Sequence, residues 1–125
     1  MSGRVVHFEI PADDLGRAET FYRDVFDWEI NSIPGMGYTL VGTTPSTENG
    51  PAEPGAINGG MLARGAPIND PVVTIEVDAI EGALKAIERL GGRTIRERMP
   101  VGDMGFAAYF ADTENNILGL WENSG

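Results

Sequence analysis

The spacing of hydrophobic residues changes from two to between three and four near residue 12. Residues 4–10 alternate between two sets of side chains and predict a β-strand, which Pro11 is expected to end because proline cannot donate to the ladder. His7 and Glu9 fall on one face of this strand. From Leu15 to Phe26 the apolar residues recur at helical spacing, so a helix is predicted over 14–27, with Asp13 or Asp14 as its N-cap. The chain therefore opens with a strand, a turn and an amphipathic helix.

The rest of the first half reads as further strands separated by turns. Alternation and turn residues predict strands over 28–33, 38–43 and 55–62. Residues 44–54 are rich in Pro, Ser, Thr, Gly and Glu, and we interpret them as the longest and most mobile loop.

The same order then begins again about 65 residues later. A strand is predicted over 72–77 and a helix after Asp78 as its N-cap, with an apolar stripe that runs from Ile80 to Leu90 and a stop at Gly91–Gly92. Strands follow over 93–98, 104–111 and 117–122. The pattern predicts an α+β protein with two βαβββ modules in one domain over 1–125. The modules cover about 4–62 and 72–122, and residues 63–71 link them.

Composition narrows the possible roles of this domain. The 125 residues carry 9 basic and 19 acidic side chains, a net charge of −10, which argues against nucleic-acid and membrane-surface partners. Cysteine is absent, so disulfides, thiolate catalysis and cysteine-ligated zinc are excluded. No secretory signal and no long apolar run is visible, so we expect a cytoplasmic protein.

Particular motifs give the chain a family resemblance. They are His7-Phe8-Glu9-Ile10, Phe21-Tyr22 and Phe26-Asp27-Trp28 in the first half, Leu90-Gly91-Gly92 in the second, and the ending Phe110-Ala111-Asp112-Thr113-Glu114-Asn115-Asn116-Ile117-Leu118-Gly119-Leu120-Trp121-Glu122. On these motifs the chain resembles the vicinal-oxygen-chelate superfamily of glyoxalases, extradiol dioxygenases and bleomycin-resistance proteins. It is most similar to the small single-domain branch related to lactoylglutathione lyase. The resemblance implies a curled, cup-shaped mixed sheet with helices outside, a homodimer, and a divalent metal on the cup floor.

The metal ligands implied by the resemblance are mostly missing from this sequence. His7 matches the first ligand position, whereas the other three fall on Gly59 or Gly60, on Val72 and on Gly119. One imidazole does not hold a divalent ion, because catalytic zinc sites use three protein ligands. We therefore predict no metal cofactor. A displaced site made of His7, Glu9 and Glu76 is the alternative.

The polar residues of the predicted cup are the candidates for chemistry. His7 and Glu9 are the candidate catalytic residues, His7 as a general base or as a cup residue hydrogen-bonded to a neighbour such as Glu9. Glu9 and Glu76 are interpreted as carboxylates that face water near the rim, with a general acid/base pair as the alternative. The candidate ligand-binding residues are Tyr38, Gly60, Thr74, Glu76, Tyr109 and Trp121. The glycines at the ligand positions leave room for a substrate or allow close packing.

Three functions remain open on the sequence alone. The first is a small-molecule binder or a lyase- or isomerase-type enzyme without the full metal site. The second is a non-catalytic sequestration protein of the bleomycin-resistance type, in which an acidic cup attracts a cationic compound. The third is a divalent-metal glyoxalase or dioxygenase with a displaced site.

Overall fold

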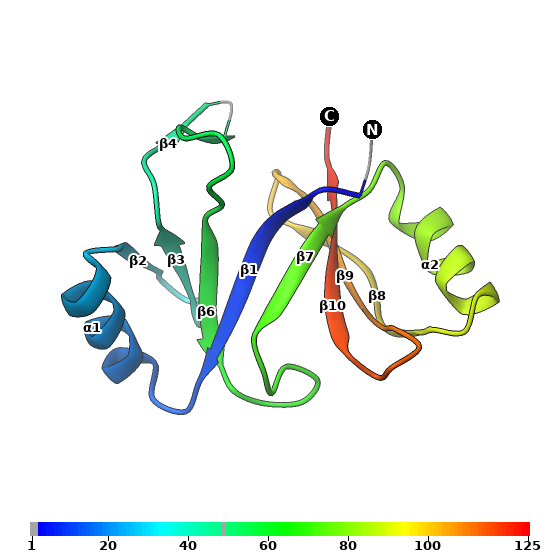
Figure 1. The fold of residues 1–125 in the computed structure, drawn as a ribbon, viewed down its shortest axis with the longest axis horizontal. Coiled ribbons are helices and arrows are strands. Elements are labelled where there is room, and N and C mark those ends of the chain that lie inside the picture. The colour runs from blue at the N-terminus through cyan, green and yellow to red at the C-terminus, as the bar shows by residue number, and fades with distance from the viewer. Residues whose placement is uncertain (1–2, 49) are drawn as a thin grey trace. The chain divides into compact units, whose positions relative to one another are not determined.

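The computed structural model describes residues 3–48 and 50–125, and these form two compact units (Figure 1). One unit is His7–Pro71, and the other joins the described residues up to Val6 with Val72–Gly125. We call them the first and the second module. Neither helix in the described residues is long and apolar enough to cross a membrane.

The two modules have the same topology. The first contains β1 (Val5–Ala12, from His7 onward), α1 (Leu15–Phe26), β2 (Glu29–Ile33), β3 (Tyr38–Gly42) and β6 (Gly59–Ala63). The second contains β7 (Val72–Glu76), α2 (Ile80–Arg89), β8 (Arg93–Val101), β9 (Gly105–Ala111) and β10 (Ile117–Asn123). The strand orders are β1-β6-β3-β2 and β7-β10-β9-β8, and in each the first two strands are parallel and the others antiparallel. The predicted α+β class with two βαβββ modules is confirmed.

Two details of the first module differ from the sequence prediction. Pro11 does not end β1, because Pro11 still pairs with Leu62 and the Arg64 N–H donates to the Ala12 carbonyl oxygen at 2.9 Å. The segment 44–54 contains the short strands β4 (Ser46–Thr47) and β5 (Gly50–Pro51), which pair with each other. Asn58 anchors this segment, since its side chain accepts from the backbone N–H groups of Thr43 and Thr44.

Helix α1 starts as predicted but contacts its sheet differently. The Asp14 side chain accepts from the Arg17 N–H at 3.0 Å and caps the helix. On the side facing the sheet, the Glu19 carboxylate accepts hydrogen bonds from Ser32 and from the fully buried Thr39. None of the described side chains of α1 is fully buried, so the apolar stripe packs only partly against the sheet.

Helix α2 carries the core of the second module. Ile80 and Leu84 pack with Ala108, Phe110 and Leu120. Leu90, predicted to extend this stripe, is 72% exposed, because the helix ends at Arg89 and Gly91 adopts the positive φ of +107° that glycine favours.

The N-terminus of α2 is capped from another strand. Asp78 was predicted as the N-cap, but Ala79 holds that position and makes no side-chain cap. The Glu122 carboxylate of β10 accepts instead from the Ile80 N–H at 2.9 Å, and it pairs with Arg98 at 3.1 Å. The terminal Glu of the predicted motif thus joins α2 to its sheet.

We expect Glu122→Gln to destabilise the protein at neutral pH and to have little effect in acid. The Arg98 hydrogen bond, followed by that from Ile80, lowers the pKa of Glu122 below its ordinary value of 4.5. A lowered pKa in the folded state gives stability above pH 4.5, which is lost as the pH falls through the folded pKa. Urea unfolding at pH 7 and at successively lower pH values measures this difference. Glu97→Gln, at an exposed residue of β8, is the control and should leave the free energy of unfolding unchanged at every pH.

Candidate functional site

Three polar side chains meet on the first module. His7 and Glu9 lie two residues apart on β1, so they share one face, and Tyr38 comes from β3. The Tyr38 hydroxyl donates to Glu9 Oε2 at 2.9 Å and lies 2.8 Å from His7 Nε2. Thr39, the next residue along β3, bonds to α1, so the three side chains occupy the sheet face opposite α1. We call this group the His7–Tyr38–Glu9 chain.

Gly60 allows this contact to form. Strand β6 lies between β1 and β3, so Tyr38 has to reach across it. A Cβ on Gly60 would lie 2.0 Å from the Tyr38 hydroxyl oxygen, so any side chain there would displace the tyrosine. Of the two roles considered for this glycine, the structure favours close packing.

Burial determines the charge of His7 within the His7–Tyr38–Glu9 chain. Removal from water lowers the pKa of His7, and the Glu9 charge opposes this shift without cancelling it, so the imidazole is neutral at pH 7. Glu9 is only 7% exposed, so the prediction that it faces water is wrong. Burial is tolerated because the carboxylate receives the tyrosine hydrogen bond.

The hydrogen-bond directions assign the tautomer of His7. A tyrosine hydroxyl has one proton, and Tyr38 gives it to Glu9. His7 Nε2 must then carry a proton and donate to the tyrosine oxygen. In the neutral ring the lone pair is left on Nδ1, which is the atom able to accept a proton.

Two of the candidates on the second module are buried beside Gly119. Thr74 and Tyr109 are buried, and both pair in register with Gly119. A Cβ on Gly119 would lie 2.8 Å from Thr74 Oγ1, so here too the space left by a glycine is filled by a neighbour. The Trp121 indole N–H donates to Asn123 Oδ1 at 2.8 Å.

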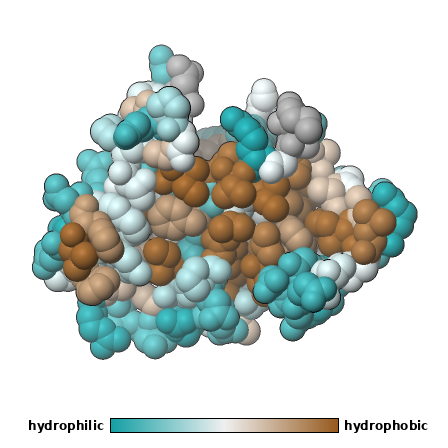
Figure 2. Space-filling model, viewed as in Figure 1, coloured by the Kyte–Doolittle hydropathy of each residue, from teal (hydrophilic) through white to brown (hydrophobic). Residues whose placement is uncertain are grey.

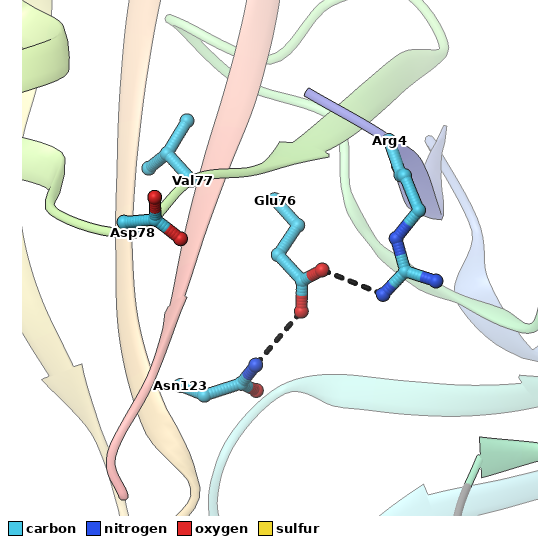
Figure 3. Close-up of a pocket in the computed structure, with 5 residues that line it drawn as sticks. All are labelled: Arg4, Glu76, Val77, Asp78 and Asn123. Carbon is cyan, nitrogen blue, oxygen red and sulfur yellow. Dashed lines mark hydrogen bonds and ion pairs between the residues drawn. The ribbon is translucent and has the colours of Figure 1, made fainter. Parts of the chain in front are cut away.

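Glu76 lies in a separate polar pocket of the second module. Its two carboxylate oxygens accept from Arg4 Nη2 and from Asn123 Nδ2, each at 2.7 Å (Figure 3). The Arg4 hydrogen bond, followed by that from Asn123, lowers the pKa of Glu76. The pocket measures about 560 Å³, and Val77 and Asp78 complete its lining.

Sequence reasoning missed Arg4 and Asn123. Asn123 lies two residues after Trp121 and four after Gly119, so strand alternation places all three on one face and could have identified it. No sequence signal pointed to Arg4, because its contact with Glu76 joins residues 72 positions apart.

The donor set at the expected metal positions does not fit a divalent ion. His7 Nε2 is engaged by Tyr38, and Gly59, Gly60, Val72 and Gly119 offer no ligating side chain. Both oxygens of Glu76 already accept hydrogen bonds within its own module. Within residues 3–48 and 50–125, no three His, Cys, Asp or Glu side chains group in a way that could hold a metal ion.

Comparisons with known proteins agree with this architecture. Residues 4–44 match the family model described as bleomycin resistance protein-like N-terminal. A glyoxylase-like domain-containing protein of Didymella fabae is 27% identical over 127 residues, covering 100% of this chain and 98% of the relative.

Solved structures share the fold at low sequence identity. A hypothetical protein from Bacillus halodurans superposes with a TM-score of 0.67 at 15% identity, covering 100% of this chain and 97% of that one. Methylmalonyl-CoA epimerase of Streptomyces coelicolor, in complex with 2-nitronate-propionyl-CoA, gives 0.67 at 14% identity with full coverage of both chains. The epimerase of Mycobacterium tuberculosis gives 0.62 at 15% identity, covering 98% and 89%. Taken with the repeated βαβββ topology, these matches support the resemblance of the chain to the vicinal-oxygen-chelate superfamily.

Proposed function

We propose that this protein is a glyoxalase-like enzyme of the lyase or isomerase type that acts on a small molecule without the superfamily's full metal site. The observation that carries the proposal is the His7–Tyr38–Glu9 chain, with a neutral histidine held at 2.8 Å from the tyrosine that bridges to Glu9. The proposal treats the whole chain as one domain, with residues 63–71 joining the modules. It also includes the pairing of two chains.

The proposed chemistry is proton transfer at a carbon next to a carbonyl group. His7 Nδ1 takes the proton, and the C–H electron pair moves into an enolate on the substrate. The resulting imidazolium keeps its Nε2–H bond to Tyr38, and the negative charge of Glu9 behind Tyr38 stabilises it. Return of the proton from Nδ1 to the same face of that carbon restores the substrate, whereas its delivery to the opposite face, after the enolate has turned over, gives the epimer. Either step restores the neutral ring.

Two further observations support this reading. Leu40 is 45% exposed and lies two residues after Tyr38 on the same strand face. It therefore offers an apolar contact for a substrate bound beside the His7–Tyr38–Glu9 chain. The fold is shared with proteins named methylmalonyl-CoA epimerases, and an epimerase inverts the configuration at one carbon.

The second candidate is a sequestration protein. The family model that matches residues 4–44 is bleomycin-resistance-like, and the net charge of −10 favours capture of a cationic compound. Under this alternative, the His7–Tyr38–Glu9 chain binds and orients a ligand without turnover.

A ligand screen in D₂O separates the two candidates. Thermal shift against α-ketoaldehyde–thiol adducts and against cationic glycopeptides finds compounds that bind. Mass spectrometry then measures deuterium incorporated at the carbon next to the carbonyl. Catalysed exchange in a bound adduct is the expected result. Saturable binding of a glycopeptide, with no exchange in any adduct, would instead support sequestration and contradict the enzyme.

A further inference from the structure

Helix α1 leaves large apolar side chains in water. Phe21, Val25 and Phe26 are 55%, 54% and 55% exposed, although they lie within six residues. Figure 2 shows apolar side chains over α1 bordered by hydrophilic ones. Isolated exposed apolar residues are common, but a group of this kind on one helix is typical of an interaction surface.

Helical geometry separates the inner from the outer side of α1. Glu19 bonds to the sheet, and Leu15, Ala18 and Tyr22 share its side and are partly buried. At 3.6 residues per turn, Arg17, Phe21, Asp24 and Val25 form a stripe about 100° wide on the outer side. Phe26 lies off this stripe and stacks on Trp28, with ring centroids 5.5 Å apart.

The charges on this stripe match a second copy of the same helix. Arg17 lies about one turn before Phe21, and Asp24 lies about one turn after it. Across the described residues, neither the Arg17 guanidinium nor the Asp24 carboxylate makes a hydrogen bond or an ion pair. When two such helices pack antiparallel about a two-fold axis at Phe21, each Arg17 faces Asp24 of the partner subunit.

We propose that the outer face of α1 is a self-association surface that pairs with the same face of a second copy. Phe21 and Val25 form its apolar centre, and two ion pairs between Arg17 and the partner's Asp24 fix the antiparallel direction. Opposite charges at such positions select the partner and its register more than they add affinity. The inference rests on the proposed pairing of two chains but not on the chemistry at His7, so the two can fail separately.

A charge-swap experiment tests the surface. Sedimentation equilibrium of the full chain at low salt measures the dimer dissociation constant of the wild type, of Arg17→Asp, of Asp24→Arg and of the double variant. Each single reversal places like charges opposite one another twice per dimer, so we expect it to weaken the dimer by at least about tenfold. The double variant restores opposite charges and should return to within about threefold of the wild type.

Control variants tie the result to this face. Phe21→Glu should give a monomer, whereas Leu90→Glu, at a 72% exposed apolar residue of the other module, should leave the dimer unchanged. Circular dichroism confirms that each variant is folded, and the double variant decides the question if Phe21→Glu does not fold. A monomeric wild type, or a dimer indifferent to both single reversals, would overturn the proposal. Deuterium exchange by such a monomer would leave the proposed chemistry intact.

Discussion

His7→Ala is expected to lower the rate of deuterium exchange into a bound substrate by about 10²–10⁴-fold, the usual contribution of a general base. The variant removes the only histidine of the chain, and with it the Nδ1 lone pair that accepts the proton. Binding should change less than turnover, because Tyr38 and Glu9 remain. Exchange kinetics followed by mass spectrometry under saturating substrate give the rate.

Two comparisons make this result specific. Asn69→Ala replaces an exposed polar residue of the same module and should leave the rate unchanged. Tyr38→Phe keeps the ring over Gly60 but breaks the link between His7 and Glu9, so it should lower the rate without abolishing it. An unchanged rate in folded His7→Ala protein would show that His7 is not the base.

Gly60→Ala is expected to reduce the free energy of unfolding by about 1–3 kcal/mol. The added Cβ would lie 2.0 Å from the Tyr38 hydroxyl oxygen, so the tyrosine has to leave its position. The cost is the loss of the hydrogen bond that the tyrosine donates to the buried Glu9 carboxylate. Urea denaturation of wild type and variant measures the difference.

Gly65→Ala is the matched control for this substitution. It lies in the same module, its φ is not positive, and an added Cβ meets no atom within 4 Å, so stability should change little. Equal stabilities for Gly60→Ala and Gly65→Ala would mean that Tyr38 does not occupy the space above Gly60. The rate of deuterium exchange catalysed by Gly60→Ala should fall as well, because the His7–Tyr38–Glu9 chain cannot form.

Local sequence signals were sufficient for most of the fold. Residue spacing identified both helices, and Asp14 caps α1 as its position predicts. The wrong predictions concern places where a distant residue replaces the local one. Glu122 caps α2 instead of Asp78, and Pro11 stays within β1 because β6 continues the ladder beyond it.

Strand alternation predicted the shared face of His7 and Glu9, but not what lies between them. That Tyr38 bridges the two depends on β6 separating β1 from β3 and on the absence of a side chain at Gly60. The order of the strands in the sheet is not contained in the local residue pattern, so this contact could not be predicted from it. For the same reason, burial of Glu9 could not be anticipated from its place in an alternating strand.

The most direct test of the account is the ionisation and tautomer of His7. Because His7 is the only histidine, a ¹⁵N-histidine spectrum of the untagged protein contains one imidazole. We predict a proton on Nε2, a lone pair on Nδ1 and a pKa below the ordinary 6.5 for His7, with loss of the tautomer preference in Tyr38→Phe. A proton on Nδ1, or a pKa above 6.5, would contradict this prediction.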